Sequence, residues 1–268
     1  MIIDMHCHIE FGEKSSNKGH EALRWQVEKF LKQTSADVAL LQPYSIKDKS
    51  FNGYLKLNKE LADYIKKSSH YGLARIDPVS LSKEETEKLI RKCIKMGLSG
   101  IKLHPLDGYL LRDLSNYKFI FDLAQELKIP VMVHTWFGAE NSKLGLKREP
   151  LKVVSKLAKN YTIPFIAAHA NISEDMDFES AMQTPNLYVD ISLQEFGPFK
   201  EYIEQNNNKK LINRIFYGSD FGVCKLPFFQ QKDIITPQKI RENLPPIVAD
   251  KILRRNAEKF INDYMRRK

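Results

Sequence analysis

Short apolar runs recur along the whole chain, and longer segments of mixed polarity separate them. Most of the runs lack the polar alternation of a strand with one solvent-exposed face, so we expect strands that helices cover on both sides. The pattern predicts eight strands, at Ile2–His6, Asp37–Gln42, Tyr71–Asp77, Gly100–His104, Pro130–His134, Pro164–His169, Asn186–Ser192 and Arg214–Ser219.

The segments between these runs place apolar residues at helical spacing. In Glu21–Gln33, for example, Leu23, Val27, Phe30 and Leu31 would share one face of a helix. The same pattern predicts helices at Tyr54–Lys67, Lys83–Met96, Asn116–Lys128, Pro150–Asn160 and Ile247–Tyr264, and Pro237 is expected to open a further helix.

Local signals at element ends agree with this assignment. Ser82 and Glu85 have the spacing of a capping box, and Gly97 follows a helix as a C-terminal stop. No linker or low-complexity tract divides the 268 residues, so we predict one domain over residues 1–268. Eight repeated βα units indicate a (β/α)8 TIM barrel. A doubly wound sheet is the alternative, but it would scatter the candidate site residues.

Composition narrows the class of protein further. A hydrophobic share of 43% is enough for a sizeable core, and no apolar stretch is long enough to span a membrane. The net charge of +9 is concentrated at the end, where residues 251–268 hold seven basic and two acidic residues. This distribution favours a solvated helix over a groove for nucleic acid.

The three cysteines, Cys7, Cys93 and Cys224, lie far apart and form no CxxC pair. We therefore expect a reducing, cytoplasmic environment and no disulfide framework. The start of the chain resembles a strand rather than a secretion signal.

Residues that bind metals stand where the predicted strands end. His6 and His8 follow the first apolar run, His134 and His169 end two later strands, and Asp220 follows the last. The carboxyl ends of barrel strands converge on one face, and imidazole and carboxylate suit a divalent cation such as zinc. His6 and His8 share one side of an extended strand, whereas Cys7 should face the other. The sequence thus predicts a metalloenzyme.

With these motifs the chain resembles the amidohydrolase superfamily, in particular the amidohydrolase 2 (amidohydrolase-related) branch of metal-dependent hydrolases. The resemblance covers essentially the whole chain. It rests on segments 3–8, 100–105, 131–135 and 217–221, on His169, and on the closing segment 252–260.

The resemblance implies one divalent ion held by His6, His8, His134 and Asp220. Such an ion lowers the pKa of a bound water, and Asp220 would accept its proton while His169 orients the water or polarises the substrate. Some relatives instead carry a carboxylated lysine that bridges two metals. In that arrangement Lys102, His134 and His169 would bind the second ion. We favour one ion.

Four residues are candidates for substrate contacts. An unpaired buried lysine is costly, so Lys102 should pair with a substrate carboxylate or a site acid. His104 shares its strand face and either binds substrate or opens the Pro105 loop. Arg75 could hold an anionic group or pair with Asp77, and Trp136 could line the pocket or only pack its loop.

These features favour hydrolysis of a small amide, ester or lactone, with an anionic group on the substrate. Nonoxidative decarboxylation by the same branch is the first alternative. A TatD-like deoxyribonuclease is the second, although segment 101–104 lacks the glutamate typical of that group and no basic track leads to the site. We expect a small-molecule substrate and neither nucleic acid nor membrane as a partner, and a homo-oligomer remains open.

Overall fold

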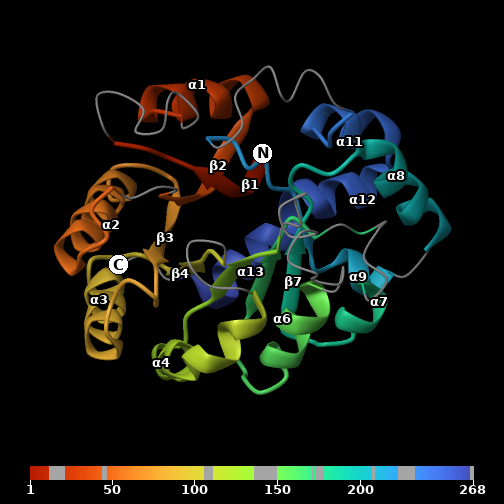
Figure 1. The fold of residues 1–268 in the computed structure, drawn as a ribbon. Coiled ribbons are helices and arrows are strands. Elements are labelled where there is room, and N and C mark those ends of the chain that lie inside the picture. The colour runs from red at the N-terminus through yellow and green to blue at the C-terminus, as the bar shows by residue number, and fades with distance from the viewer. Residues whose placement is uncertain are drawn as a thin grey trace.

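The computed structural model describes residues 1–11, 22–43, 47–105, 111–135, 150–170, 172, 178–206, 209–222 and 233–265. Eight parallel strands lie side by side in chain order and form a nearly closed ring with helices around it (Figure 1). The strands are β1 (Ile2–His8), β2 (Ala36–Gln42), β3 (Tyr71–Ile76), β4 (Gly100–Leu103), β5 (Val131–His134), β6 (Phe165–Ala168), β7 (Leu187–Asp190) and β8 (Ile215–Phe216). The predicted (β/α)8 TIM barrel is confirmed.

The helices lie between the strands along the chain and cover the outside of the ring. They are α1 (Arg24–Thr34), α2 (Phe51–Ile65), α3 (Lys83–Lys95), α4 (Lys118–Leu127), α6 (Pro150–Ala158), α7 (Phe178–Ala181), α8 (Phe196–Gln205), α9 (Lys209–Ile212), α11 (Pro237–Asn243), α12 (Pro246–Asp250) and α13 (Asn256–Tyr264). None in the described ranges is both long and apolar enough to cross a membrane.

Most predicted helices exist, with shifted ends. The capping box of Ser82 and Glu85 begins α3, and Gly97 follows it with a φ of 106°. The segment predicted as a helix from Asn116 instead starts as a 3-10 turn over Leu111–Tyr117. The prediction missed the short helices α7 and α9 and the longer α8.

The predicted closing helix is interrupted by a wide π turn over Lys251–Arg255, between α12 and α13. At this turn the carbonyl of Ile252 accepts a hydrogen bond of 3.1 Å from the backbone N–H of Tyr217. The helix therefore widens at the residue that is hydrogen-bonded to Tyr217, directly after β8.

A buried apolar cluster fills the amino-terminal part of the barrel. Alternate strand residues meet the apolar face of α13, which Figure 1 shows in dark blue behind the ring. The members are Ile3, Met5, Leu40, Leu73, Met132, Ile166, Ala168, Phe216, Ala257, Phe260, Ile261 and Met265. This end of the barrel is thus packed, which leaves the carboxyl ends of the strands for chemistry.

A bulge in β1 sets which side chains face the barrel axis. Asp4 pairs with Ala39 and Cys7 with Leu41, so three steps on β1 match two on β2. The extra residue changes the phase of side-chain alternation. Met5 therefore joins the inner cluster while Cys7, as predicted, packs in the outer layer.

The amide of Asn186 joins three backbone carbonyl groups at the start of β7. Its nitrogen lies 3.1 Å from the oxygen of Ala158, 3.0 Å from that of Tyr161 and 2.7 Å from that of Ile163. We expect Asn186→Ala to lower the free energy of unfolding by about 1–3 kcal/mol, because these carbonyls lose a partly buried donor. Urea denaturation measures the change.

Asn160→Ala is the matched control, because the exposed Asn160 amide donates to a nearby carbonyl, that of Lys156 in the preceding helix α6. Its effect should stay within about 0.5 kcal/mol. Equal losses in the two variants would contradict the role of Asn186.

Candidate metal centre

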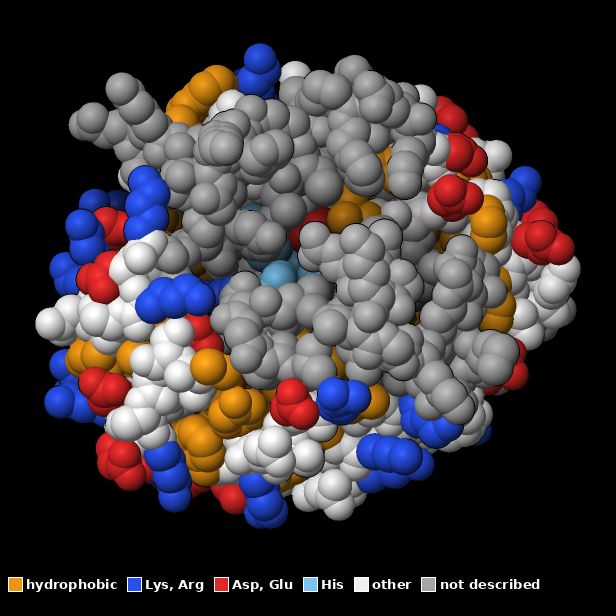
Figure 2. Space-filling view, in the orientation of Figure 1, with side chains coloured by type: hydrophobic (Ala, Val, Ile, Leu, Met, Phe, Trp, Pro, Cys, Tyr) orange, Lys and Arg blue, Asp and Glu red, His pale blue; other side chains and the backbone are white. Residues whose placement is uncertain are grey.

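The predicted histidines gather at the carboxyl ends of the strands. Figure 2 looks onto this end of the barrel and shows histidine side chains at the bottom of a central hollow. His6 and His8 end β1, and His134 ends β5. The fold therefore brings together residues that are far apart in the sequence, as the predicted barrel requires.

The segment after β8 closes the ring against β1 and carries Asp220. The N–H of Asp220 donates to the carbonyl of His6 at 2.7 Å, and the N–H of His8 donates to the carbonyl of Phe221 at 2.7 Å. These bonds fix the backbone of Asp220 between the two histidines.

Two glycines allow this close approach. A Cβ on Gly218 would lie 2.8 Å from the Cβ of His6, and one on Gly222 would lie 2.3 Å from the carbonyl oxygen of His8. Asp220 itself has a φ of 54°, which is uncommon for a residue other than glycine. Such conformations persist where the surrounding structure enforces them, and they cluster at functional sites.

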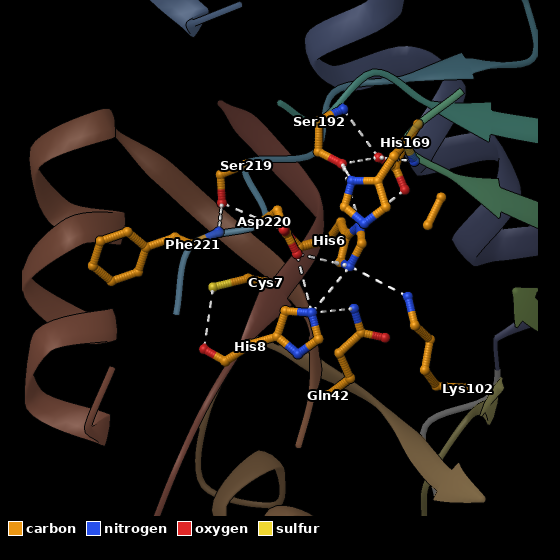
Figure 3. Close-up of polar contacts among 12 residues, drawn as sticks. His6, Cys7, His8, Gln42, Lys102, His169, Ser192, Ser219, Asp220 and Phe221 are labelled. Atoms are coloured by element: carbon orange, nitrogen blue, oxygen red, sulfur yellow. Dashed lines mark hydrogen bonds and ion pairs between the residues drawn. The ribbon is translucent and has the colours of Figure 1, made fainter. Parts of the chain in front are cut away.

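Three ligand atoms form a nearly equilateral triangle (Figure 3). Nε2 of His6 lies 3.2 Å from Nε2 of His8, and Oδ1 of Asp220 lies 3.1 Å from each. Ligands about 2.0–2.1 Å from a tetrahedral or octahedral ion are separated by about 3.0–3.4 Å, so the triangle has the dimensions of one face of a coordination sphere.

The protonation states of these groups also suit a cation. Burial lowers the pKa of His8 to about 3, so its imidazole is neutral near pH 7. Burial alone would raise the pKa of Asp220, but the neighbouring His169, His6 and His8 hold it below its ordinary value. Imidazole nitrogens and a carboxylate oxygen are donors that zinc and similar ions prefer.

Two further donors border the triangle. Nζ of Lys102 lies 3.3 Å from Nε2 of His6, and Nε2 of Gln42 lies 3.4 Å from Nε2 of His8. Both side chains are fully buried. Burial lowers the pKa of Lys102 to about 7, against the opposing effect of Asp190 and Asp220.

His169 lies beside the triangle, and His134 lies one ring further away. The ring centroid of His169 is 4.7 Å from that of His6, and burial lowers the pKa of His169 to about 4. The His134 ring is 4.8 Å from His169 and stacks on His104 at 4.1 Å.

Among the described residues, two groups of His and Asp have ligand atoms within 4.8 Å of one another. One group is His6, His8 and Asp220, and the other is His6, His169 and Asp190. His134 belongs to neither group. Its ring nitrogens therefore do not form a cluster of this size with the other residues that the sequence predicts as ligands.

Arg75 is buried in β3, where it pairs in register with Lys102 of β4. The predicted alternative partner, Asp77, accepts hydrogen bonds from the hydroxyls of Tyr54 and Ser80 at 2.9 and 2.8 Å. Arg75 contributes to the lowered pKa of both Lys102 and His104, where burial is the larger cause, so its positive charge acts on the site. Trp136 lies outside the described residues.

The sequence analysis missed three buried polar residues of the site, Gln42, Asp190 and Ser192. Gln42 ends β2 and Asp190 ends β7, and Nδ1 of His6 lies 3.0 Å from Oδ2 of Asp190. The rule that selected the histidines, a polar residue at a strand end, would also have selected both.

Solved structures of similar fold include enzymes of more than one reaction type. One is a 5-carboxyvanillate decarboxylase from Novosphingobium aromaticivorans with bound manganese (TM-score 0.69, 14% identity, covering 98% of this chain and 97% of that one). Another is a probable 2-pyrone-4,6-dicarboxylic acid hydrolase from Acinetobacter baumannii with citric acid bound (0.65, 15%, 97% and 99%). At these identities the likeness establishes the fold.

No curated protein sequence matches the chain significantly. The sequence model of the amidohydrolase family, in contrast, matches residues 3–262, from the first strand to the last helix. The resemblance read from the strand-end motifs is confirmed, and the chain belongs to the amidohydrolase family.

Proposed function

We propose that this protein is a metal-dependent hydrolase that acts on a small amide, ester or lactone bearing an anionic group. The observation that carries the proposal is the triangle of His6 Nε2, His8 Nε2 and Asp220 Oδ1, with edges of 3.1–3.2 Å. The family to which the chain belongs comprises enzymes, and its structural neighbours include hydrolases and decarboxylases.

The triangle would hold one divalent ion. Zinc suits its two nitrogens and one oxygen, and His134 is the proposed fourth ligand. Nζ of Lys102 approaches the same triangle, at 3.3 Å from Nε2 of His6. When bound, such an ion polarises a carbonyl group and lowers the pKa of a water.

Two neighbouring side chains would accept a proton or a hydrogen bond during the reaction. Asp220 is held as a carboxylate and can accept a proton at an oxygen not used for coordination. His169 is neutral because burial lowers its pKa to about 4, so one of its ring nitrogens can also accept a hydrogen bond from water or substrate.

The positive side chains of the site favour an anionic substrate. Lys102 and Arg75 are neighbours across β3 and β4, and 0% and 2% of their surfaces are exposed. The protonated form of Lys102 is repelled by Arg75, and a substrate carboxylate between the two side chains would offset that repulsion. The citrate and benzoate ligands of the two structural neighbours are carboxylates as well.

Decarboxylation is the second candidate, because one of the structural neighbours is a carboxyvanillate decarboxylase. The same arrangement would then hold the substrate carboxylate, which leaves as carbon dioxide. The two reactions differ in their products: hydrolysis takes an oxygen atom from water, whereas decarboxylation releases carbon dioxide.

A substrate panel tests the proposal directly. The zinc-loaded protein should hydrolyse at least one carboxylated lactone, ester or amide in H₂¹⁸O, with one labelled oxygen in the product and no carbon dioxide. The double variant His6→Ala/His8→Ala should show no turnover above background. Carbon dioxide release from an aromatic or unsaturated acid, without labelling, would favour the decarboxylase.

The panel includes single- and double-stranded DNA. Metal-dependent cleavage of DNA that fails in the His6→Ala/His8→Ala variant, with no activity on small molecules, would replace the proposal with the nuclease. The basic residues that follow His134 and Asp220 in the sequence, Lys143, Lys147, Arg148 and Lys225, lie outside the described residues.

Metal retention tests the ligand set without a substrate. His6→Ala/His8→Ala should retain less than about a tenth of the metal bound by the wild type, because two of the three triangle atoms are lost. His70→Ala is the control, since His70 precedes β3 and its ring accepts the N–H of Ala39 and stacks on Tyr64. Elemental analysis after dialysis should give normal metal content for this control, and a normal value for the double variant would refute the assignment.

Asp220→Asn should reduce kcat by about 100-fold or more, because an amide cannot accept the proton that a carboxylate accepts. Steady-state kinetics on an accepted substrate measures the effect. Asp63→Asn, on the exposed surface of α2, should leave kcat unchanged. Wild-type turnover in Asp220→Asn would exclude its role as base.

A further inference from the structure

Asp190 stands at the centre of a buried network that reaches two of the site histidines. Its side chain is fully buried at the end of β7. Oδ2 lies 3.0 Å from Nδ1 of His6, while Oδ1 accepts the N–H of Ser192 at 3.0 Å and the N–H of His169 at 3.3 Å. The hydroxyl of Ser192 also donates to Oδ1.

The contact with His6 determines where that ring holds its proton. A carboxylate only accepts hydrogen bonds, so Nδ1 of His6 must carry the hydrogen that points to Asp190. With its hydrogen on Nδ1, the ring can present a lone pair on Nε2, which is the atom that faces His8 and Asp220. Carboxylate partners of this kind fix the tautomer of metal-binding histidines.

Ser192 extends the same reasoning to His169. The Ser192 hydroxyl has one hydrogen, which it donates to Asp190, and its oxygen lies 2.8 Å from Nδ1 of His169. That oxygen can therefore only accept, so Nδ1 of His169 must be the donor. The neutral His169 ring is left with its lone pair on Nε2.

Asp190 also supports the backbone of His169. This residue has a φ of 62°, in the left-handed region that non-glycine residues rarely adopt. The bond from its N–H to Asp190 helps to hold that conformation, so one carboxylate restrains both the ring and the main chain of His169.

We propose that Asp190, acting with Ser192, is a positioning residue that sets the tautomers of His6 and His169 together, so that both present Nε2 lone pairs to the reacting centre. The role of these tautomers in metal binding rests on the proposed function, whereas the hydrogen bonds that set them do not. It assigns roles to two residues that bind neither the ion nor the substrate.

The test begins with metal-free protein labelled with ¹⁵N in its histidines, at a pH above neutral. In the wild type the NMR chemical shift of Nδ1 should be that of a protonated nitrogen for both His6 and His169. The signals of each residue are assigned by comparison with a variant that lacks that histidine. Ser192→Ala should release His169 from this state and leave His6 in it. Ser192→Thr keeps the hydroxyl and should restore the wild-type pattern.

Metal affinity gives the second readout. Asp190→Asn can turn its NH₂ group toward His6 and favour the wrong tautomer, so zinc affinity measured by chelator competition should fall about 10–100-fold. Ser192→Ala should change zinc affinity by less than about threefold. Asp63→Asn controls for the loss of a carboxylate elsewhere, and thermal melting checks that each variant is folded.

Three results would overturn the proposal. The first is wild-type zinc affinity and His6 tautomer in Asp190→Asn. The second is an unchanged His169 tautomer in Ser192→Ala, which decides the matter even if Asp190→Asn fails to fold. The third is two zinc ions per wild-type protein and one in Asp190→Asn, which would make Asp190 a ligand in the group of His6, His169 and Asp190. Predicted tautomers in a protein without hydrolase activity would reject only the proposed function.

Discussion

The site depends on the seam between β1 and the segment after β8, because the three atoms of its triangle come from both sides of that seam. Asp4 joins the two sides below the triangle: its Oδ1 accepts the N–H of His6 at 3.1 Å and the N–H of Ser219 at 2.9 Å. Above it, the N–H of Asp220 donates to the carbonyl of His6. A change in register of one residue on either side would turn His6, His8 or Asp220 away from the others.

This seam concentrates charge inside the barrel. Asp4, Asp190 and Asp220 are each at most 3% exposed, and Lys102 is fully buried beside them. Burial raises the pKa of Asp4 to about 7, against several hydrogen bonds that oppose it. Ionisable groups packed this closely are costly for stability unless each charge has a partner, and perturbed pKa values of this kind are typical of functional sites. A bound cation would supply the balancing charge for the carboxylates.

The sequence was sufficient to predict the architecture, and some of the candidate site residues that it selected lie together in the structure. Eight apolar runs and the polar residues that follow them predicted the barrel, and His6, His8 and Asp220 indeed meet at one point. The family followed from the same motifs. These features are local, since each is a short pattern at the end of a strand.

What the sequence did not reveal depends on contacts between distant segments. The bulge in β1 arises from pairing with β2, and the π turn before α13 coincides with a bond to Tyr217. The strand-end rule could have selected Asp190, but its role follows only from its contact with His6, 184 residues away. The position of His134 also follows only from the three-dimensional structure, in which its ring stacks on that of His104 and lies outside the triangle.

The central claim is that one divalent ion is held by His6, His8 and Asp220. Anomalous diffraction from a crystal grown with zinc, recorded on both sides of the zinc absorption edge, tests it most directly. We expect a single strong peak about 2 Å from Nε2 of His6, Nε2 of His8 and a carboxylate oxygen of Asp220. A fully occupied zinc peak elsewhere in the barrel, with these three atoms still in contact with one another, would contradict the account.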